Sequence, residues 1–233
     1  MSDLRITSVT SGYGSVCIIN EVSMQVRQGE IVAVIGRNGV GKTTLLRTII
    51  GDVRSTSGSI TLGDSDITLL RPSRRARLGI GYVPQGRGIF SQMTVGANLE
   101  LGQNVGSSGA AHMEKAFNYF PALRKRQYQM AGSMSGGEQQ QLAIARILVG
   151  KPCLILLDEP SEGIQPNIVQ EIGRTIRRVR DEEGLTILIV EQNLNLIQAS
   201  ADRCIVLDKG TIVAEIAPDD LNDPRNAKRY LAI

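Results

Sequence analysis

A glycine-rich stretch that ends in a lysine and two threonines is the part of the sequence best suited to bind a charged ligand. It spans Gly36–Thr44, after an apolar run over Ile31–Ile35 that is typical of a buried parallel strand and before a helical pattern over Leu45–Ile50. Glycines let the backbone close around an anion where a Cβ would obstruct it. The following helix directs free N–H groups and a positive dipole end at that anion. Strand, glycine-rich turn, lysine with hydroxyl, and helix together predict a nucleoside triphosphate site.

Within this stretch, two side chains have specific expected roles. Lys42 would place its charge at the β- and γ-phosphates, and the hydroxyl of Thr43 would bind Mg²⁺. The expected nucleotide-binding residues of the stretch are Gly36, Arg37, Asn38, Gly39, Gly41, Lys42, Thr43 and Thr44.

Two carboxylates follow the apolar run Cys153–Leu157. A strand that is apolar throughout and ends in Asp158 and Glu159 places both acids at the carboxyl edge of a parallel sheet, where ligands bind in such folds. We expect Asp158 to reach the Mg²⁺, directly or through water, and Glu159 to accept a proton from the attacking water. A solvated pair that caps the next helix is the simpler alternative, and the upstream glycine-rich stretch argues against it.

A second glycine turn opens the expected helix Glu138–Val149. Ser135, Gly136 and Gly137 repeat the helix N-terminus of the first turn but have no lysine or metal-binding hydroxyl after them. One nucleotide rarely needs two helix N-termini from distant parts of one chain. We therefore expect two chains, arranged head to tail, so that each turn meets the γ-phosphate held by the other.

The elements that must position these residues follow from hydrophobic periodicity. Strands of period two at Leu4–Val9 and Val22–Val26 flank a predicted loop at Ser11–Gly14, in which Tyr13 is displayed either to pack over a sheet or to stack on a base. The other expected elements are a basic helix after Pro72, strands Ile80–Val83 and Thr186–Val190, helices Val95–Leu101, Ala110–Tyr119 and Pro166–Glu183 with a linker at Gly102–Gly109, a hairpin of Ala201–Leu207 and Thr211–Ile216, and a short C-terminal helix after Pro218. The fold class is α/β, a P-loop NTPase core of mixed and parallel sheet flanked by helices, with an N-terminal antiparallel β part and an inserted helical subdomain.

Composition sets few limits on function. The 233 residues are 42% hydrophobic and 21% charged, as in an ordinary soluble protein, and a net charge of +3 is too small to indicate nucleic acid as a partner. No apolar run approaches the ~20 residues that span a bilayer, and no signal-peptide core is present. With His112 the only histidine, a metal site built on histidines is excluded. Two predictions concern the other polar residues. A solvated helix face is expected to carry Arg71, Arg74, Arg75 and Arg77. Buried thiols in a reducing compartment are expected for Cys17, Cys153 and Cys204.

Taken together, these motifs resemble those of ABC-transporter ATPase subunits over nearly the whole chain. Gly36–Thr44 resembles the Walker A motif, Leu154–Glu159 the Walker B, and Ser135–Gln139 the signature motif, with Glu138 where the family usually has Gln. The resemblance places Gln85 at the Q-loop as a Mg²⁺ ligand and catalytic residue, Tyr13 at the adenine-stacking position, and Ser161–Ile164 at the D-loop. It implies ATP and Mg²⁺ as cofactors and a single ABC ATPase domain over 1–233, with a catalytic core of 1–85 and 150–233 and a helical subdomain of 86–149.

Three local strings narrow the resemblance. Gly81–Phe90, Glu159–Pro166 and Val190–Asn193 are similar to the second ATPase of bacterial importers for branched-chain amino acids, urea and short amides. Most of the family has a histidine at the position of Gln192. An amide can donate to phosphate and accept from water but cannot carry charge, so we expect Gln192 to assist hydrolysis.

The resemblance implies partners and a location. The expected partners are integral membrane permease subunits, a second ATPase subunit in a homo- or heterodimer, and, indirectly, a periplasmic solute-binding protein, with no nucleic acid. Gln85 and the helical insertion would couple the cycle to the permease, which docks near Arg87–Phe90, and the chain would lie peripherally on the cytoplasmic face of the inner membrane. A soluble ABC ATPase without a permease, as in iron–sulfur cluster assembly, is the alternative. A GTPase switch is disfavoured because no Asn-Lys-x-Asp string occurs.

Overall fold

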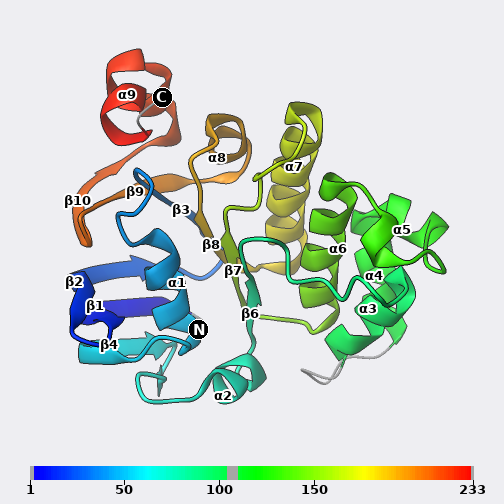
Figure 1. Ribbon diagram of the computed structural model, residues 1–233, viewed down its shortest axis with the longest axis horizontal. Coiled ribbons are helices and arrows are strands. Elements are labelled where there is room, and N and C mark those ends of the chain that lie inside the picture. Colours follow the sequence, from blue (N-terminus) through cyan, green and yellow to red (C-terminus); the bar gives the residue numbers. More distant parts are fainter. Residues whose placement is uncertain (1–2, 104–109, 232–233) are drawn as a thin grey trace.

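The structure, a computed structural model, describes residues 3–103 and 110–231. Its centre is a six-stranded sheet in the order β10-β9-β3-β8-β7-β6 (Figure 1). The strands are β3 (Ile31–Ile35), β6 (Ile80–Val83), β7 (Leu154–Asp158), β8 (Thr186–Val190), β9 (Arg203–Asp208) and β10 (Thr211–Ile216). Neighbouring strands are parallel except β9 and β10, which form the predicted hairpin.

The central strands are buried on both faces, which explains why their sequences are continuous apolar runs and do not alternate. In β7, Leu154 and Leu156 pack toward α1 and the N-terminal sheet, whereas Ile155 and Leu157 pack toward the long helices on the other side. Every residue of β7 and β8 is buried. The two larger hydrophobic cores of the molecule therefore meet across this one sheet.

A four-stranded antiparallel sheet forms one end of the molecule, in the order β2-β1-β4-β5. Its strands are β1 (Leu4–Tyr13), β2 (Val16–Val26), β4 (Ser55–Leu62) and β5 (Ser65–Asp66). Helix α1 (Lys42–Ile50) lies between this sheet and the central one (Figure 1). The predicted loop at Ser11–Gly14 was wrong, because β1 keeps pairing with β2 and β4 as far as Ser11 and with β2 as far as Tyr13.

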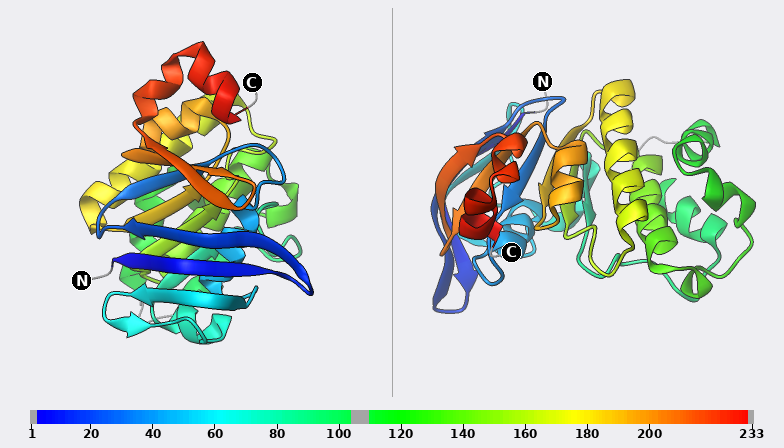
Figure 2. Two further views of the ribbon diagram at one scale, coloured as in Figure 1. Left: turned by 90° about the vertical axis from the view of Figure 1, so that its left-hand side faces the viewer. Right: turned by 90° about the horizontal axis from the view of Figure 1, so that it is seen from above.

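Helices α6 (Gly136–Val149) and α7 (Pro166–Glu183) cover the other face of the central sheet. Helices α3 (Val95–Gln103), α4 (Ala110–Tyr119) and α5 (Pro121–Lys125) extend beyond α6, at the opposite end from β1 and β2 (Figure 2). Gly102 belongs to α3, where a Cβ would come within 2.1 Å of the Arg146 carbonyl oxygen, so glycine permits close contact with α6. Of the predicted linker Gly102–Gly109, residues 104–109 lie outside the described residues.

The remaining elements lie around this framework. They are α2 (Pro72–Arg77), η1 (Ala131–Ser133), α8 (Leu194–Ser200), η2 (Pro218–Asn222) and α9 (Pro224–Leu231). The C-terminal segment packs Leu221 and Leu231 against Ile197 and Val206 in a third apolar cluster. Among the described helices, none has both the length and the apolar character required to cross a bilayer.

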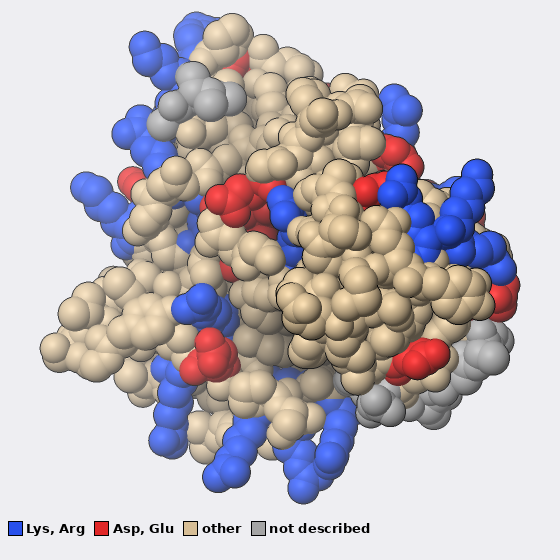
Figure 3. All heavy atoms as spheres, turned by 45° about the vertical axis from the view of Figure 1, so that its right-hand side comes forward, with Lys and Arg blue, Asp and Glu red and all other residues tan. Residues whose placement is uncertain are grey.

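Three expectations about single side chains were wrong. Arg75 is 3% exposed, not solvated, since its guanidinium donates to the carbonyls of Thr48 and Ile49 at the C-terminal end of α1. That position suits a cation, because the helix dipole is negative there. Of the three cysteines only Cys204 is buried, while Cys17 is exposed and Cys153 is half-buried. Other Lys and Arg side chains stand in separate groups around the rim of the face in Figure 3, with Asp and Glu beside several of them.

Candidate nucleotide-binding and catalytic site

Four strands of the central sheet end at the same edge, and the segments that follow them carry most of the predicted site. Val34 of β3 pairs with Val190 of β8, and Asp158 of β7 also pairs with Val190. This register sets Lys42, Gln85, Glu159 and Gln192 around one location, because each follows the carboxyl end of one of these strands or of β6.

The glycine-rich loop closes over the N-terminus of α1. Gly41 is the N-cap with φ 109°, a left-handed conformation that favours glycine, and no side chain caps this helix. Lys42 is 4% exposed, and its Nζ donates to the carbonyls of Gly36 at 2.8 Å and Arg37 at 2.9 Å. Burial lowers the pKa of Lys42, against the opposing effect of Glu159 and other nearby carboxylates. The loop thus has open N–H groups and a buried cation beside them, which suits a bound phosphate.

The Asp158 carboxylate has the environment expected of a metal ligand. It is 1% exposed, and its partners are two neutral hydroxyls, Thr43 Oγ1 at 3.0 Å and Tyr82 Oη at 3.1 Å. Burial raises the pKa of Asp158, so a divalent cation would stabilise its charged form. The described residues hold no cluster of three or more acidic, histidine or cysteine side chains that could bind a metal by themselves. Such a site fits Mg²⁺, which usually takes one or two protein ligands plus phosphate and water oxygens.

Glu159 follows Asp158 in a left-handed backbone conformation, with φ 47°, and its carboxylate contacts a different set of side chains. Its Oε2 accepts from Gln85 Nε2 at 3.2 Å, and its Oε1 accepts from Gln192 Nε2 at 3.1 Å. Lys42 Nζ lies 3.9 Å from the same Oε1. Gln192 Nε2 also donates to Asn38 Oδ1 at 2.6 Å. The structure therefore brings the three residues predicted to be catalytic into direct contact, with two amides orienting one carboxylate.

Two residues at this edge were not singled out from the sequence. Tyr82, which holds Asp158, is one, and Glu191 is the other. Glu191 is 3% exposed and accepts from the backbone N–H groups of Ser161 at 3.2 Å and Gln192 at 2.7 Å. Burial raises its pKa, against the lowering effect of these hydrogen bonds. The available signal was position, since Glu191 follows the apolar strand β8 just as Asp158 ends β7.

The second glycine turn lies apart from the first. Its helix, α6, is on the opposite face of the central sheet from α1 (Figure 1). Among the described residues, no hydrogen bond or ion pair joins Ser135, Gly136 or Gly137 to the stretch Gly36–Thr44. Ser135 is exposed and caps α6.

One arginine links the loops around the second turn. Arg87 Nη1 donates to Gln139 Oε1 at 3.0 Å, and Nη2 lies 3.4 Å from the carbonyl oxygen of Glu162. It thus joins the segment after Gln85 to α6 and to the segment Ser161–Ile164. The predicted base-stacking residue, Tyr13, is 47% exposed at the end of β1, where Arg47 Nη1 lies 3.5 Å from its hydroxyl. The structure leaves that ring open on the surface.

Comparison with known proteins places this geometry in one family. The sequence profile described as "ABC transporter" matches residues 19–162. The chain is 44% identical over 231 residues to the high-affinity branched-chain amino acid transport ATP-binding protein BraG of Pseudomonas aeruginosa, covering 98% of this chain and 99% of that one. A probable branched-chain amino acid transport ATP-binding protein, LivF of Archaeoglobus fulgidus, is 36% identical over 90% of this chain and 89% of its own. The lipopolysaccharide export ATP-binding protein LptB of Escherichia coli is 34% identical, with 98% and 96% coverage.

A solved structure shows the same fold. An ATP-binding cassette of an ABC transporter superimposes with a TM-score of 0.85 at 27% identity, covering 100% of this chain and 99% of that one. The antiparallel sheet, the mostly parallel central sheet and the flanking helices are common to both, so the predicted fold class is confirmed. The chain belongs to the ABC transporter family, as one of its ATP-binding ATPase subunits.

Proposed function

We propose that this chain is the motor subunit of a bacterial importer of branched-chain amino acids, with urea or short amides as alternative solutes. The identities to BraG and LivF, over almost the full length of each chain, support amino-acid import more strongly than the lower identity to the export protein LptB. Coupling to transport is favoured over a soluble ABC ATPase for the same reason.

The observation that carries the catalytic proposal is the position of Glu159. Its carboxylate lies between two amide donors and beside Lys42, one residue after the buried Asp158. Such a carboxylate can accept a proton from a water that attacks the γ-phosphate. Gln85 and Gln192 would orient Glu159 and that water, since their N–H groups already point at the two carboxylate oxygens. Lys42 would exchange loop carbonyls for phosphate oxygens.

Asp158, Thr43 and Gln85 would hold Mg²⁺, which would neutralise negative charge that develops on the phosphates. The other proposed contacts to ATP come from Gly36, Arg37, Asn38, Gly39, Gly41 and Thr44, with Tyr13 stacking on the adenine. Ser135, Gly136 and Gly137 would complete the site of a second ATPase subunit, identical or related. Their helix, α6, lies on the opposite face of the central sheet from α1, which supports a nucleotide held between two chains.

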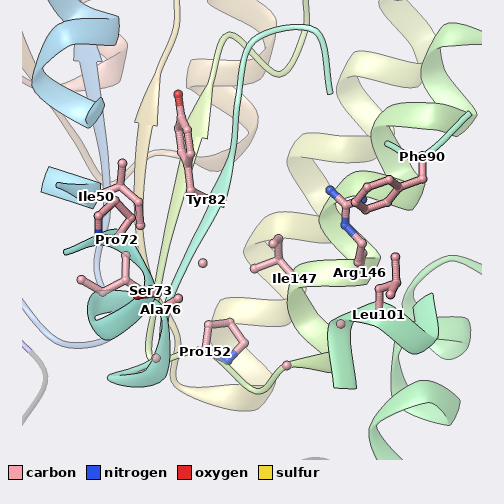
Figure 4. Close-up of a pocket in the computed structure, with 15 residues that line it drawn as sticks. Ile50, Pro72, Ser73, Ala76, Tyr82, Phe90, Leu101, Arg146, Ile147 and Pro152 are labelled. Atoms are coloured by element: carbon pink, nitrogen blue, oxygen red, sulfur yellow. The ribbon is translucent and has the colours of Figure 1, made fainter. Parts of the chain in front are cut away.

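An apolar cavity of about 600 Å³ supports a permease as a further partner, besides the second ATPase subunit. It opens between α2, β6, α3 and α6, and Pro72, Leu101, Ile147 and the half-exposed Phe90 line it (Figure 4). We propose that a cytoplasmic helix of the permease occupies this cavity, which places the chain peripherally at the cytoplasmic face of the membrane, with a periplasmic binding protein as the indirect partner. The cavity lies between the proposed catalytic core, 1–85 and 150–233, and the proposed helical subdomain, 86–149, of one ATPase domain.

Solute uptake in cells tests this function. In the strain that carries the gene, deletion should abolish high-affinity uptake of labelled leucine, and the parent gene should restore it. Glu159→Gln should not restore uptake, although the protein accumulates normally. If the deletion leaves leucine uptake unaffected but abolishes urea uptake, the transported solute is urea and not a branched-chain amino acid. If the deletion abolishes neither leucine nor urea uptake, and no permease co-purifies with the chain, the result favours a soluble ABC ATPase.

A further inference from the structure

The second glycine turn carries an acidic residue at the place where the proposed function requires a phosphate to bind. Glu138 Oε2 accepts from the backbone N–H of Ser135 at 2.9 Å and from its hydroxyl at 2.8 Å. These contacts form a capping box with the N–H of Glu138, which donates back to Ser135 Oγ. The carboxylate therefore holds the hydroxyl of the signature serine.

A carboxylate in this position opposes a triphosphate. Under the proposed function, the turn approaches the γ-phosphate of a nucleotide on another chain. The Glu138 carboxylate and that phosphate are both negative and would repel each other. Capping does not require the charge, because a neutral glutamine at the third helical position completes the same box. A cation that offsets the charge of Glu138 would therefore favour association of the two chains around the nucleotide.

Arg126 supplies that cation. It follows α5, and its Nη2 lies 3.0 Å from Glu138 Oε1, the carboxylate oxygen that the capping box does not use. Its Nη1 donates to Gln129 Oε1 at 3.2 Å, and Gln129 in turn donates to Ser133 Oγ at 2.9 Å. The guanidinium is thus fixed on the segment just before the signature turn.

We propose that Arg126 is a positioning residue that neutralises Glu138, so that the signature turn can receive the phosphate of a second subunit. The inference rests on the proposed two-chain site. Side-chain exposures of 43% for Arg126 and 22% for Glu138 make this pair a small contributor to folding stability. Its effect is on the charge that the turn presents to the partner's nucleotide.

Substitutions that neutralise these charges, made in a hydrolysis-deficient background, test the proposal. Arg126→Gln, Glu138→Gln and the double variant are each combined with Glu159→Gln. Sedimentation velocity then gives the ATP concentration for half-maximal association, alone and with the ATPase subunit that co-purifies with the chain. Arg126→Gln should raise this concentration about 10-fold at low salt, because it leaves an unpaired carboxylate facing the phosphate, and added salt should shrink the effect. Glu138→Gln should leave it unchanged or lower it, and the double variant should return to within about 2-fold of the parent.

A purely structural pair gives a different pattern. If the pair only pins the segment before α6, Glu138→Gln should impair association as much as Arg126→Gln, and the double variant should be no better, which would overturn the proposal. Fluorescent ATP binding to the monomer should be equal in all variants, since the first glycine loop is untouched. If the Glu159→Gln parent itself never associates with ATP, the two-chain function fails and this inference fails with it. If the parent associates and Arg126→Gln has no effect, only this inference fails.

Discussion

The two glycine turns of this chain open two helices in opposite ways. At the N-terminus of α1, Gly41 provides no side-chain cap, the first turn has no acidic residue, and Lys42 is buried beside the loop. At the N-terminus of α6, Ser135 and Glu138 form a complete capping box, and Ser135 is exposed. The N-terminus of α1 would receive an anion only from a ligand, whereas the N-terminus of α6 already has the carboxylate of Glu138 beside it.

This difference separates two tasks. A helix end with free N–H groups and a cation is suited to hold phosphate tightly within one chain. An end whose donors are partly satisfied by its own carboxylate has less to gain from an anion, so it is suited to a contact that forms and breaks in each cycle. We therefore expect the first turn to determine nucleotide affinity and the second to determine association of two chains.

Paired substitutions in the two turns should separate these tasks most strongly. Lys42→Ala should weaken ATP binding at least about 100-fold, because hydrogen bonds to a charged group contribute ~1.5–3 kcal/mol each. Ser135→Ala should leave binding to the monomer unchanged. Isothermal titration calorimetry of the folded variants provides the measurement. Equal affinity for the parent and Lys42→Ala would contradict the role of the first turn.

A smaller effect is expected where Gln192 supports the base. Gln192→Ala should lower kcat by about one to two decades, since it removes an orienting hydrogen bond worth ~1–3 kcal/mol. Gln192→His should keep or raise turnover, and ATP affinity should change little in both. Steady-state ATPase activity measures this. A Gln192→Ala enzyme as fast as the parent would make Gln192 a bystander.

Tyr82 gives a test of the metal site beside the first turn. Tyr82→Phe removes one of two hydroxyls that hold Asp158. The Mg²⁺ concentration for half-maximal ATP binding should therefore rise about 10-fold, because a hydrogen bond to a charged group contributes at least ~1.5 kcal/mol. Binding of ATP without Mg²⁺ should not change. Tyr119→Phe is the matched control, because its hydroxyl donates to Glu182 and Glu183, away from the site. An equal Mg²⁺ shift in both variants would refute a local role.

The smallest expected effect concerns the adenine. Tyr13→Ala should weaken ATP binding by about 1 kcal/mol, the scale of stacking between a base and an aromatic ring. Tyr13→Phe should be nearly silent, because the hydroxyl has only an exposed contact of 3.5 Å with Arg47. Competition binding of ATP and inorganic triphosphate isolates the base. Equal losses in both variants would assign the effect to the hydroxyl.

Local patterns in the sequence were sufficient for the elements that carry the site. The apolar runs of β3, β7 and β8 are continuous because both faces are buried, and α7 begins and ends as its proline and amphipathic pattern predict. The residues that follow these strands then converge at one edge, as expected for a parallel sheet. The predicted roles of Lys42 and Glu159 depended on this convergence.

Contacts between distant segments were beyond such patterns. Arg75 looks like part of a solvated basic helix, and its burial depends on the carbonyls of α1, 26 or more residues away. The pairing of Tyr82 with Asp158 across two strands, and of Arg126 with Glu138, depends on side-chain positions that hydrophobic periodicity does not encode. The sequence could therefore predict which residues lie together at the edge of the sheet, but not the residues that hold them in position.

The central claim is that one nucleotide is held between the first turn of one chain and the second turn of another. The most direct measurement is sedimentation velocity of Glu159→Gln with and without ATP and Mg²⁺, alone and mixed with its partner ATPase. Turnover should fall ~10²–10⁴-fold with loss of the base, and an ATP-dependent dimer should accumulate. Adding Ser135→Asp should prevent that dimer, because aspartate still caps the helix but repels the phosphate. A Glu159→Gln protein that stays monomeric at saturating ATP in both settings would contradict the claim.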